Sequence, residues 1–304
     1  MSPEQLIHVV NVQVIPLCLF LIMLGMGLSL VADDFRRVVA YPRAVAIGLG
    51  CQLVLLPLIG FGLANVMPLS PELAVGVMLL AVCPGGTTSN LYAHLGRGDV
   101  ALSVTLTAVA SVVTVFTIPF IINGTLLHFM GETAQLSLPV GKTMISLMAL
   151  TAIPIAIGMT IRRFFPRFAI IVEQKVKYFA VIFLILLIGF LVFQQMDVFL
   201  DSLIKAGPVA LVLNLSTMAI GFWCARAFAL NRAQSVSVTL EVGLQNSSLS
   251  MVLALGMLNN YAMSLTPAIY TGVMFITAGM LVYFTSRWLP ARDLRTAVVQ
   301  ADSA

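Results

Sequence analysis

The chain has 304 residues, of which 60% are hydrophobic and only 9% are charged, and its mean hydropathy is +1.04. A soluble domain carries roughly 25% charged residues, so this composition excludes a soluble globular protein and indicates a polytopic membrane protein. The four cysteines lie in apolar segments and form no CxxC pair, which argues against a disulfide framework or a zinc site. The formal net charge of +4 is compatible with nucleic-acid binding, so the positions of the basic residues must decide.

The apolar segments come in stretches long enough to cross a bilayer, which takes about 20 residues per helix. We predict nine spans, at residues 6–30, 44–66, 72–94, 100–122, 141–161, 172–193, 208–228, 234–258 and 266–287. The longest outer connection is expected at residues 123–140, and a second polar outer loop at 194–207. Because nine is odd, the two termini should lie on opposite sides of the membrane.

The basic residues are distributed unevenly over the connections. Of the sixteen Lys and Arg residues, only Lys142 and Lys205 fall on one side. Cytoplasmic loops carry an excess of Lys and Arg, so the other side is predicted to be cytoplasmic, with the N-terminus outside. This bias explains the basic character without nucleic acid. The predicted cytoplasmic set is Arg36, Arg37, Arg43, Arg97, Arg162, Arg163, Arg167, Lys175, Lys177, Arg226, Arg232, Arg287, Arg292 and Arg295.

The third span contains a helix-breaking centre, Pro-Gly-Gly at 84–86, followed by Thr-Thr-Ser-Asn at 87–90. Proline removes a backbone donor and glycine permits unusual torsions, so the helix should stop and restart here. The restarted N-terminus would point unpaired amides into the middle of the membrane. A simple proline kink is the alternative, but four consecutive hydroxyl and amide side chains argue against it.

The eighth span contains a polar run at 241–248 that begins with Glu241, the only carboxylate placed deep in an apolar span. A charged group there costs roughly 2.5–3.5 kcal/mol on insertion scales, so it needs a partner or a purpose. Five hydrogen-bonding side chains around Gly243 indicate a second helix interruption, which is tolerated where it lines a buried or watery cavity. We interpret this run as half of a binding site.

Polar residues in two other spans leave two interpretations open. Gln52 in the second span either bonds to another helix or contacts a ligand. Ser103, Thr107 and Ser111 lie four residues apart on one face of the fourth span. Taken alone this stripe is structural, because such hydroxyls can bond to their own helix.

A pair of interrupted spans at corresponding positions of two halves is typical of secondary transporters. If the first half has lost its first helix, each interrupted span is the fourth member of a five-span inverted repeat. Carboxylate, hydroxyl and amide oxygens suit a hard monovalent cation, and no His or Cys cluster is available for a transition metal. One glutamate beside two sodium ions would leave one positive charge, which an anionic substrate would cancel.

Three segments resemble the bile acid:sodium symporter family, including its bacterial members: Cys-Pro-Gly-Gly-Thr-Thr-Ser-Asn at 83–90, Gly-Asp-Val-Ala-Leu-Ser at 98–103 and Glu-Val-Gly-Leu-Gln-Asn-Ser at 241–247. The resemblance implies an all-α inverted-repeat transporter with a panel and a core domain, in which two broken helices cross. The panel would hold the first span and residues 141–193. The core would hold the second span, residues 67–122 and residues 208–288, and a cytoplasmic tail would follow at 289–304.

The resemblance also implies the ligands. A first sodium ion would be held by Ser89, Asn90, Ser103, Thr107 and Glu241. A second would be held by Gln52, Glu241, Gln245 and the carbonyl oxygens of Val242 and Leu244. The substrate would lie near Thr87 and Asn246. Bacterial relatives usually have ten spans, and smaller residues are usual at the positions of Thr88 and Ser248, so the substrate remains open between bile-acid-like anions and small acids such as pyruvate or pantoate.

We therefore predict sodium-coupled uptake of an organic anion by alternating access in a bacterial cell membrane. The expected partners are that anion and the lipid bilayer, with no nucleic acid, and a monomer is the expected state. Proton coupling through Glu241 is an alternative, because burial favours an uncharged carboxyl group. A receptor or scaffold with the same fold is another. An intramembrane hydrolase is disfavoured, because His8, His94 and His128 lie at span ends or in a loop, and Glu241 has no acidic partner.

Overall fold

A computed structural model describes residues 5, 7, 9–131 and 137–288 of the chain. The described residues form helices and short connections, with a single isolated bridge between Gly85 and Gln245 and no strand. The predicted tail at 289–304 lies outside the described residues. The helices are α2 (Ile15–Ser29), α3 (Ala32–Ala40), α4 (Pro42–Gly50), α5 (Leu56–Val66), α6 (Pro71–Ala81), α7 (Thr88–Leu95), α8 (Val100–Met130), α9 (Val140–Leu147), α10 (Ile153–Phe164), α11 (Pro166–Gln194), α12 (Met196–Ala227), α13 (Arg232–Gly243), α14 (Ser247–Val252) and α15 (Tyr261–Trp288).

The all-helical, polytopic architecture is as predicted. Among the described residues, seven continuous helical stretches are long and apolar enough to cross a bilayer, and Pro71–Ala81 and Ser247–Met257 are shorter apolar helices. These two belong to the third and eighth predicted spans. Both are shorter because the helix is interrupted beside them.

Wide π-helical turns join several of the helices. Three of them, Val10–Val14, Cys51–Leu55 and Met148–Ala152, end two residues before a proline. Proline has no N–H and its ring crowds the carbonyl four residues earlier, so the preceding turn widens while the helix continues. The turn at Cys51–Leu55 carries Gln52, which is buried.

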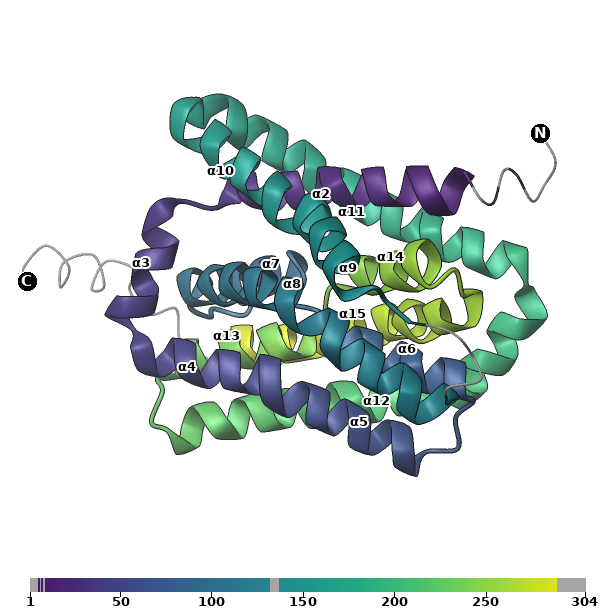
Figure 1. Cartoon of the computed structure of the whole chain (residues 1–304). Helices are drawn as coiled ribbons and strands as arrows, with labels where there is room; N and C mark the ends of the chain where they lie inside the picture. The colour runs from purple at the N-terminus through teal and green to yellow at the C-terminus, as the bar shows by residue number, and fades with distance from the viewer. Residues whose placement is uncertain (1–4, 6, 8, 132–136, 289–304) are drawn as a thin grey trace, which may run out of the picture.

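The helices fall into two groups, which Figure 1 shows one above the other. In the first, the α2 group, α2 packs against α10 and α11, and α9 leads into α10. The second, the α15 group, contains α4 to α8 and α12 to α15, with α15 packed against α6 and α12. Small residues allow the close α2–α10 contact: a Cβ on Gly27 would lie 2.2 Å from the carbonyl oxygen of Ile155, and one on Gly158 would lie 2.4 Å from that of Leu24.

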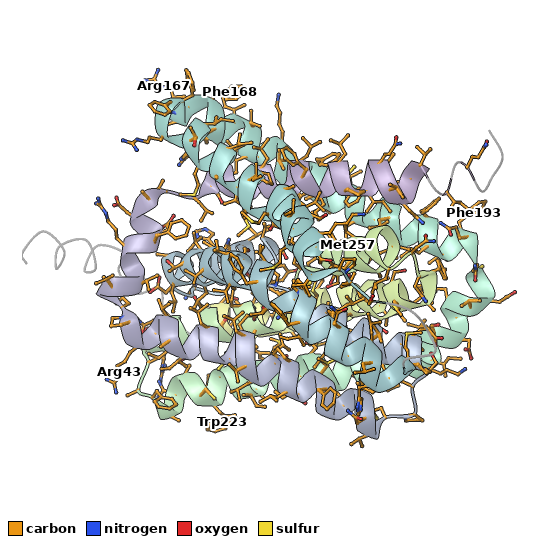
Figure 2. The ribbon with its side chains drawn as sticks, viewed as in Figure 1. Arg43, Arg167, Phe168, Phe193, Trp223 and Met257 are labelled. Atoms are coloured by element: carbon orange, nitrogen blue, oxygen red, sulfur yellow. The ribbon has the colours of Figure 1, made fainter. Side chains whose placement is uncertain are left out.

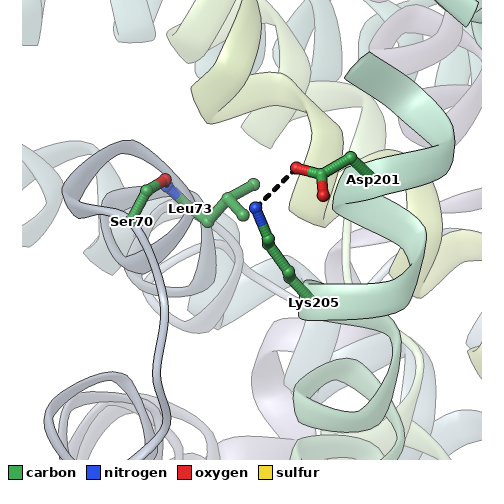
Figure 3. A network of polar contacts seen from close by, with 4 residues as sticks. All are labelled: Ser70, Leu73, Asp201 and Lys205. Carbon is green, nitrogen blue, oxygen red and sulfur yellow. Dashed lines mark hydrogen bonds and ion pairs between the residues drawn. The ribbon is translucent and has the colours of Figure 1, made fainter. Parts of the chain in front are cut away.

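The two ends of the molecule differ in charge. Arg43 and Arg167 lie at one end, which Figure 2 shows on the left, and Phe193 lies at the other. Near the second end, Ser70 caps α6 by accepting from the Leu73 amide, and Lys205 pairs with Asp201 of α12 at 2.7 Å (Figure 3). The arginine-bearing end is the one predicted to be cytoplasmic.

Helices extend into both predicted outer loops, which corrects the boundaries at 122 and 208. Helix α8 continues to Met130, and α12 begins at Met196. Asn123 lies within α8, where its side chain bonds to both backbone groups of Leu138 at 2.7–2.8 Å and holds the returning chain against the helix. The polar side chain of Asn123 therefore makes a tertiary contact from within the helix.

Candidate ion-binding site

The two interrupted helices meet at their breaks. Helix α6 ends at Ala81 and α7 begins at Thr88, while α13 ends at Gly243 and α14 begins at Ser247. Between them, the Gly86 amide donates to the Leu244 carbonyl at 2.7 Å, and the Asn246 amide donates to the Pro84 carbonyl at 3.0 Å. This antiparallel pairing satisfies backbone groups that the breaks release, which is the condition for irregular backbone at membrane depth. The predicted interruptions are thus confirmed, within a few residues of their expected limits.

The Glu241 carboxylate is fully buried beside this crossing, at 0% exposure. Its Oε2 accepts from the hydroxyls of Ser89 at 2.7 Å and Ser103 at 2.9 Å. Its Oε1 lies 2.5 Å from Oγ1 of Thr107. The structure therefore brings four of the five residues predicted for the first sodium site into direct contact.

Asn90, the fifth residue, follows Ser89 directly in α7 but makes no hydrogen-bond contact with Glu241 in the described part of the chain. Its Oδ1 is buried and accepts no hydrogen bond from any described residue. A buried carbonyl oxygen without a donor is unfavourable unless a ligand or cation contacts it. The oxygen donors at this site fit a sodium ion, for which carboxylate, hydroxyl and amide oxygens would serve as ligands.

The site depends on a glycine in the break. A Cβ added to Gly85 would lie 2.2 Å from Oε1 of Glu241. At that distance a side chain would displace the carboxylate or the backbone, so the bare backbone of residue 85 leaves room for the carboxylate where it lies.

The residues predicted for the second sodium site also lie together, but they are bonded to one another. Gln52 Nε2 donates to Gln245 Oε1 at 2.7 Å and to the Cys83 carbonyl at 3.0 Å. Gln245 Nε2 donates to the Val242 carbonyl at 2.7 Å. The Leu244 carbonyl already accepts from Gly86, so an ion here would replace or share these contacts.

The two residues predicted to contact substrate have different surroundings. Thr87, together with Asn90, lines a cavity of about 390 Å³ between the α2 group and helices α7 and α8. Asn246 is buried, and its Oδ1 accepts from the Leu249 amide at the start of α14. It does not line that cavity, and its contacts in the structure are those of a helix cap.

Sequence reasoning missed a buried network on the other side of the break. The Gly243 carbonyl, at the end of α13, accepts from Asn214 Nδ2 at 2.8 Å and from the Tyr270 hydroxyl at 2.9 Å. Thr277 in turn donates to Asn214 Oδ1 at 2.6 Å. A buried asparagine in an apolar span signals such a network, whereas nothing in the sequence distinguishes Tyr270 from other aromatic residues.

Among the described residues, no group of three His, Cys, Asp or Glu side chains gathers. Comparison with known proteins then identifies the family. A profile of the sodium bile acid symporter family matches residues 16–202. The chain belongs to this family. The family membership that the resemblance implied is thereby confirmed.

Relatives in the sodium bile acid symporter family are transporters by name. The uncharacterized sodium-dependent transporter YocS of Bacillus subtilis is 33% identical over 79% of this chain and 73% of its own length. A probable sodium/metabolite cotransporter, BASS2, of Oryza sativa is 30% identical over 90% of this chain and 64% of its own length. The ileal sodium/bile acid cotransporter of Oryctolagus cuniculus is 28% identical over 82% of this chain and 72% of its own length. The family is thus one of multi-pass membrane transporters and not of enzymes.

Proposed function

We propose that this protein is a sodium-coupled symporter of an organic anion that works by alternating access in a bacterial cell membrane. One observation carries the proposal: a fully buried carboxylate, Glu241, lies where two interrupted helices meet and accepts from hydroxyl groups of two further helical segments, α7 and α8. The names of the relatives support sodium as the coupling ion.

In this proposal a first sodium ion binds between Glu241, Ser89, Ser103, Thr107 and Asn90. The buried and unpartnered Oδ1 of Asn90 supports its role as a ligand. A second ion binds at Gln52 and Gln245, where it takes over the oxygens that these two amides now share with each other. Two ions and one carboxylate leave a positive charge, and the anion enters because it compensates that charge.

The α2 group corresponds to the proposed panel and the α15 group to the proposed core. The cavity between them supports this division, because its walls come from α2, α10 and α11 on one side and from α7 and α8 on the other. The lining includes Arg162, Glu173 and Lys177, which lie on either side of the α10–α11 connection, the one predicted to be cytoplasmic from its basic residues. We therefore infer that this conformation presents the substrate cavity to the cytoplasm, with the N-terminus outside.

The proposal is tested by uptake into proteoliposomes. Pyruvate, pantoate and cholate are offered as labelled anions, with an inward sodium gradient and, separately, with an inward proton gradient. Uptake driven by the sodium gradient alone supports symport with sodium. Uptake that is indifferent to sodium contradicts it, and sodium-dependent binding without uptake indicates a receptor or scaffold.

Proton coupling is the second candidate. Glu241 is fully buried, and in the described part of the chain its carboxyl oxygens contact hydroxyl groups and no basic side chain. Burial disfavours the charged form of a carboxyl group, so a proton could take the place of a cation here. A proton gradient that drives uptake in the absence of sodium would select this mechanism.

A further inference from the structure

The Arg, Lys and Glu side chains among the described residues that line the cavity between the two helix groups lie on one wall. Thr87, the N-cap of α7, and Asn90 in α7 form part of the opposite wall, next to the proposed ion site. The facing wall carries Arg162 in the last turn of α10, and Glu173 and Lys177 in α11. His94 also lines the cavity, at the end of α7.

Two of these charges neutralise each other. Lys177 Nζ lies 2.5 Å from Oε1 of Glu173, one helical turn away. Glu173 is the only carboxylate among the described residues that line the cavity. Because it is already paired with Lys177, the cavity wall retains one positive charge, that of Arg162.

One donor atom of Arg162 has no partner in the described part of the chain. Its Nη1 is buried and donates no hydrogen bond to any described residue. A guanidinium remains charged at all physiological pH values, and it offers five N–H donors in a planar fork. Burying such a donor without an acceptor is costly, so the arrangement favours an anion that accepts from this guanidinium.

We propose that Arg162 binds the acidic group of the transported molecule and thereby sets the preference for anions. This inference rests on the proposed function, and it adds a recognition residue that lies outside the crossing of the broken helices. A carboxylate or sulfonate would accept two parallel hydrogen bonds from the guanidinium fork. The hydrocarbon body of the molecule would pack against apolar lining residues such as Ile22, Met26 and Val104.

The placement of Arg162 links binding to the motion of the transporter. Arg162 belongs to the α2 group, whereas Thr87 and Asn90 belong to the α15 group. An anion held between them contacts both groups at once. The bound anion can therefore stabilise one arrangement of the two helix groups over another. A ligand shifts such an equilibrium only if its affinity differs between the two states.

A purely topological role is the competing explanation, because arginines at cytoplasmic helix ends orient membrane proteins. The neighbouring Arg163 separates the two explanations. Arg163 carries the same charge and is the next residue in the chain, but it is exposed and is not among the residues that line the cavity. Its Cζ lies 5.8 Å from the centre of the Phe164 ring. Replacing either arginine with glutamine removes one positive charge from the side predicted to be cytoplasmic.

The experiment measures sodium-driven uptake into proteoliposomes for the wild type, Arg162→Gln, Arg162→Lys and Arg163→Gln. The probe is whichever of pyruvate, pantoate and cholate the wild type transports, and its uncharged methyl ester serves as the competitor. We expect Arg162→Gln to raise KM for the acid roughly tenfold or more, with the sodium concentration for half-maximal uptake unchanged. The advantage of acid over ester should disappear in the same variant. Arg163→Gln should match the wild type, and Arg162→Lys should retain part of the preference.

The sodium-induced rise in melting temperature shows that each variant is folded. Wild-type kinetics and an unchanged preference for acid over ester in Arg162→Gln would overturn the inference while leaving the proposed function intact. The same holds if Arg162→Gln and Arg163→Gln lose uptake equally, since that indicates a shared topological role. Absence of wild-type uptake for every probe would instead overturn the proposed function, and this inference with it.

Discussion

The side chains of Gln52 and Gln245 lie against each other although 193 positions of sequence separate them, and each amide donates to the oxygen of the other, at 2.7 and 3.3 Å. The pair connects the π-helical turn at Cys51–Leu55 to the break after α13. It places a second group of oxygens beside the break that follows Glu241. Whether this pair is a structural contact or an ion ligand can be decided by mutation.

Replacing Gln52 by alanine should weaken the second sodium site and leave the first. The expected result is a Hill coefficient for sodium that falls from about two toward one, because cooperativity cannot exceed the number of sites. Sodium-dependent uptake in proteoliposomes measures it. Gln195→Ala is the matched control, since Gln195 is exposed at the end of α11. If both sodium responses disappear together in Gln52→Ala, the residue is structural.

Replacing Glu241 by glutamine keeps the shape of the side chain and removes its charge. The hydroxyls of Ser89 and Ser103 keep an acceptor, so the variant should fold, but the shared anionic ligand is lost. Wild-type protein should gain about 2.7 kcal/mol of stability at a sodium concentration 100 times its Kd. The variant should gain none, which thermal unfolding in sodium and in potassium chloride measures. A sodium-dependent gain that survives in the variant contradicts the site.

Replacing Gly85 by alanine should disturb both the crossing and the carboxylate. The new Cβ would lie 2.2 Å from Oε1 of Glu241, so either the backbone or the carboxylate must move. We expect a loss of about 1–3 kcal/mol, typical of overpacking, together with weaker sodium binding. Gly124→Ala in α8 is the control, because its Cβ would meet no atom within 4 Å. That control should be neutral or more stable by up to roughly 1 kcal/mol, as expected for alanine in a helix.

The two interrupted helices could be predicted from the sequence because their causes are local. Proline and glycine at 84–86 and a carboxylate at 241 conflict with an ordinary membrane helix, and the structure breaks both helices there. The limits of α8 and α12 could not be predicted in the same way. The polar residues at 123–125 are typical of a loop, but α8 continues through them to Met130, and Asn123 bonds to Leu138 from within the helix.

The sequence also did not show which side chains contact one another in the interior of the molecule. Gln52 by itself is compatible with two roles, since the sequence does not show that it faces Gln245. Arg162 resembles every other arginine at a cytoplasmic helix end until the cavity around it is known. The sequence did not indicate a role for Tyr270, because its partner is a backbone carbonyl that any buried hydroxyl could contact.

Tyr270 provides the last prediction, because it separates stability from ion binding. Replacing it by phenylalanine removes one of two donors to the Gly243 carbonyl, while Asn214 continues to donate at 2.8 Å. The carbonyl stays satisfied, so the expected cost is about 1 kcal/mol of unfolding free energy, with unchanged affinity for sodium. Asn214→Ala should cost more, since it removes a donor from Gly243 and the acceptor of Thr277 together. Thermal unfolding with and without sodium measures both, with the exposed Tyr178→Phe as the control. Loss of sodium affinity in Tyr270→Phe would show that the end of α13 is part of the ion site and not only its support.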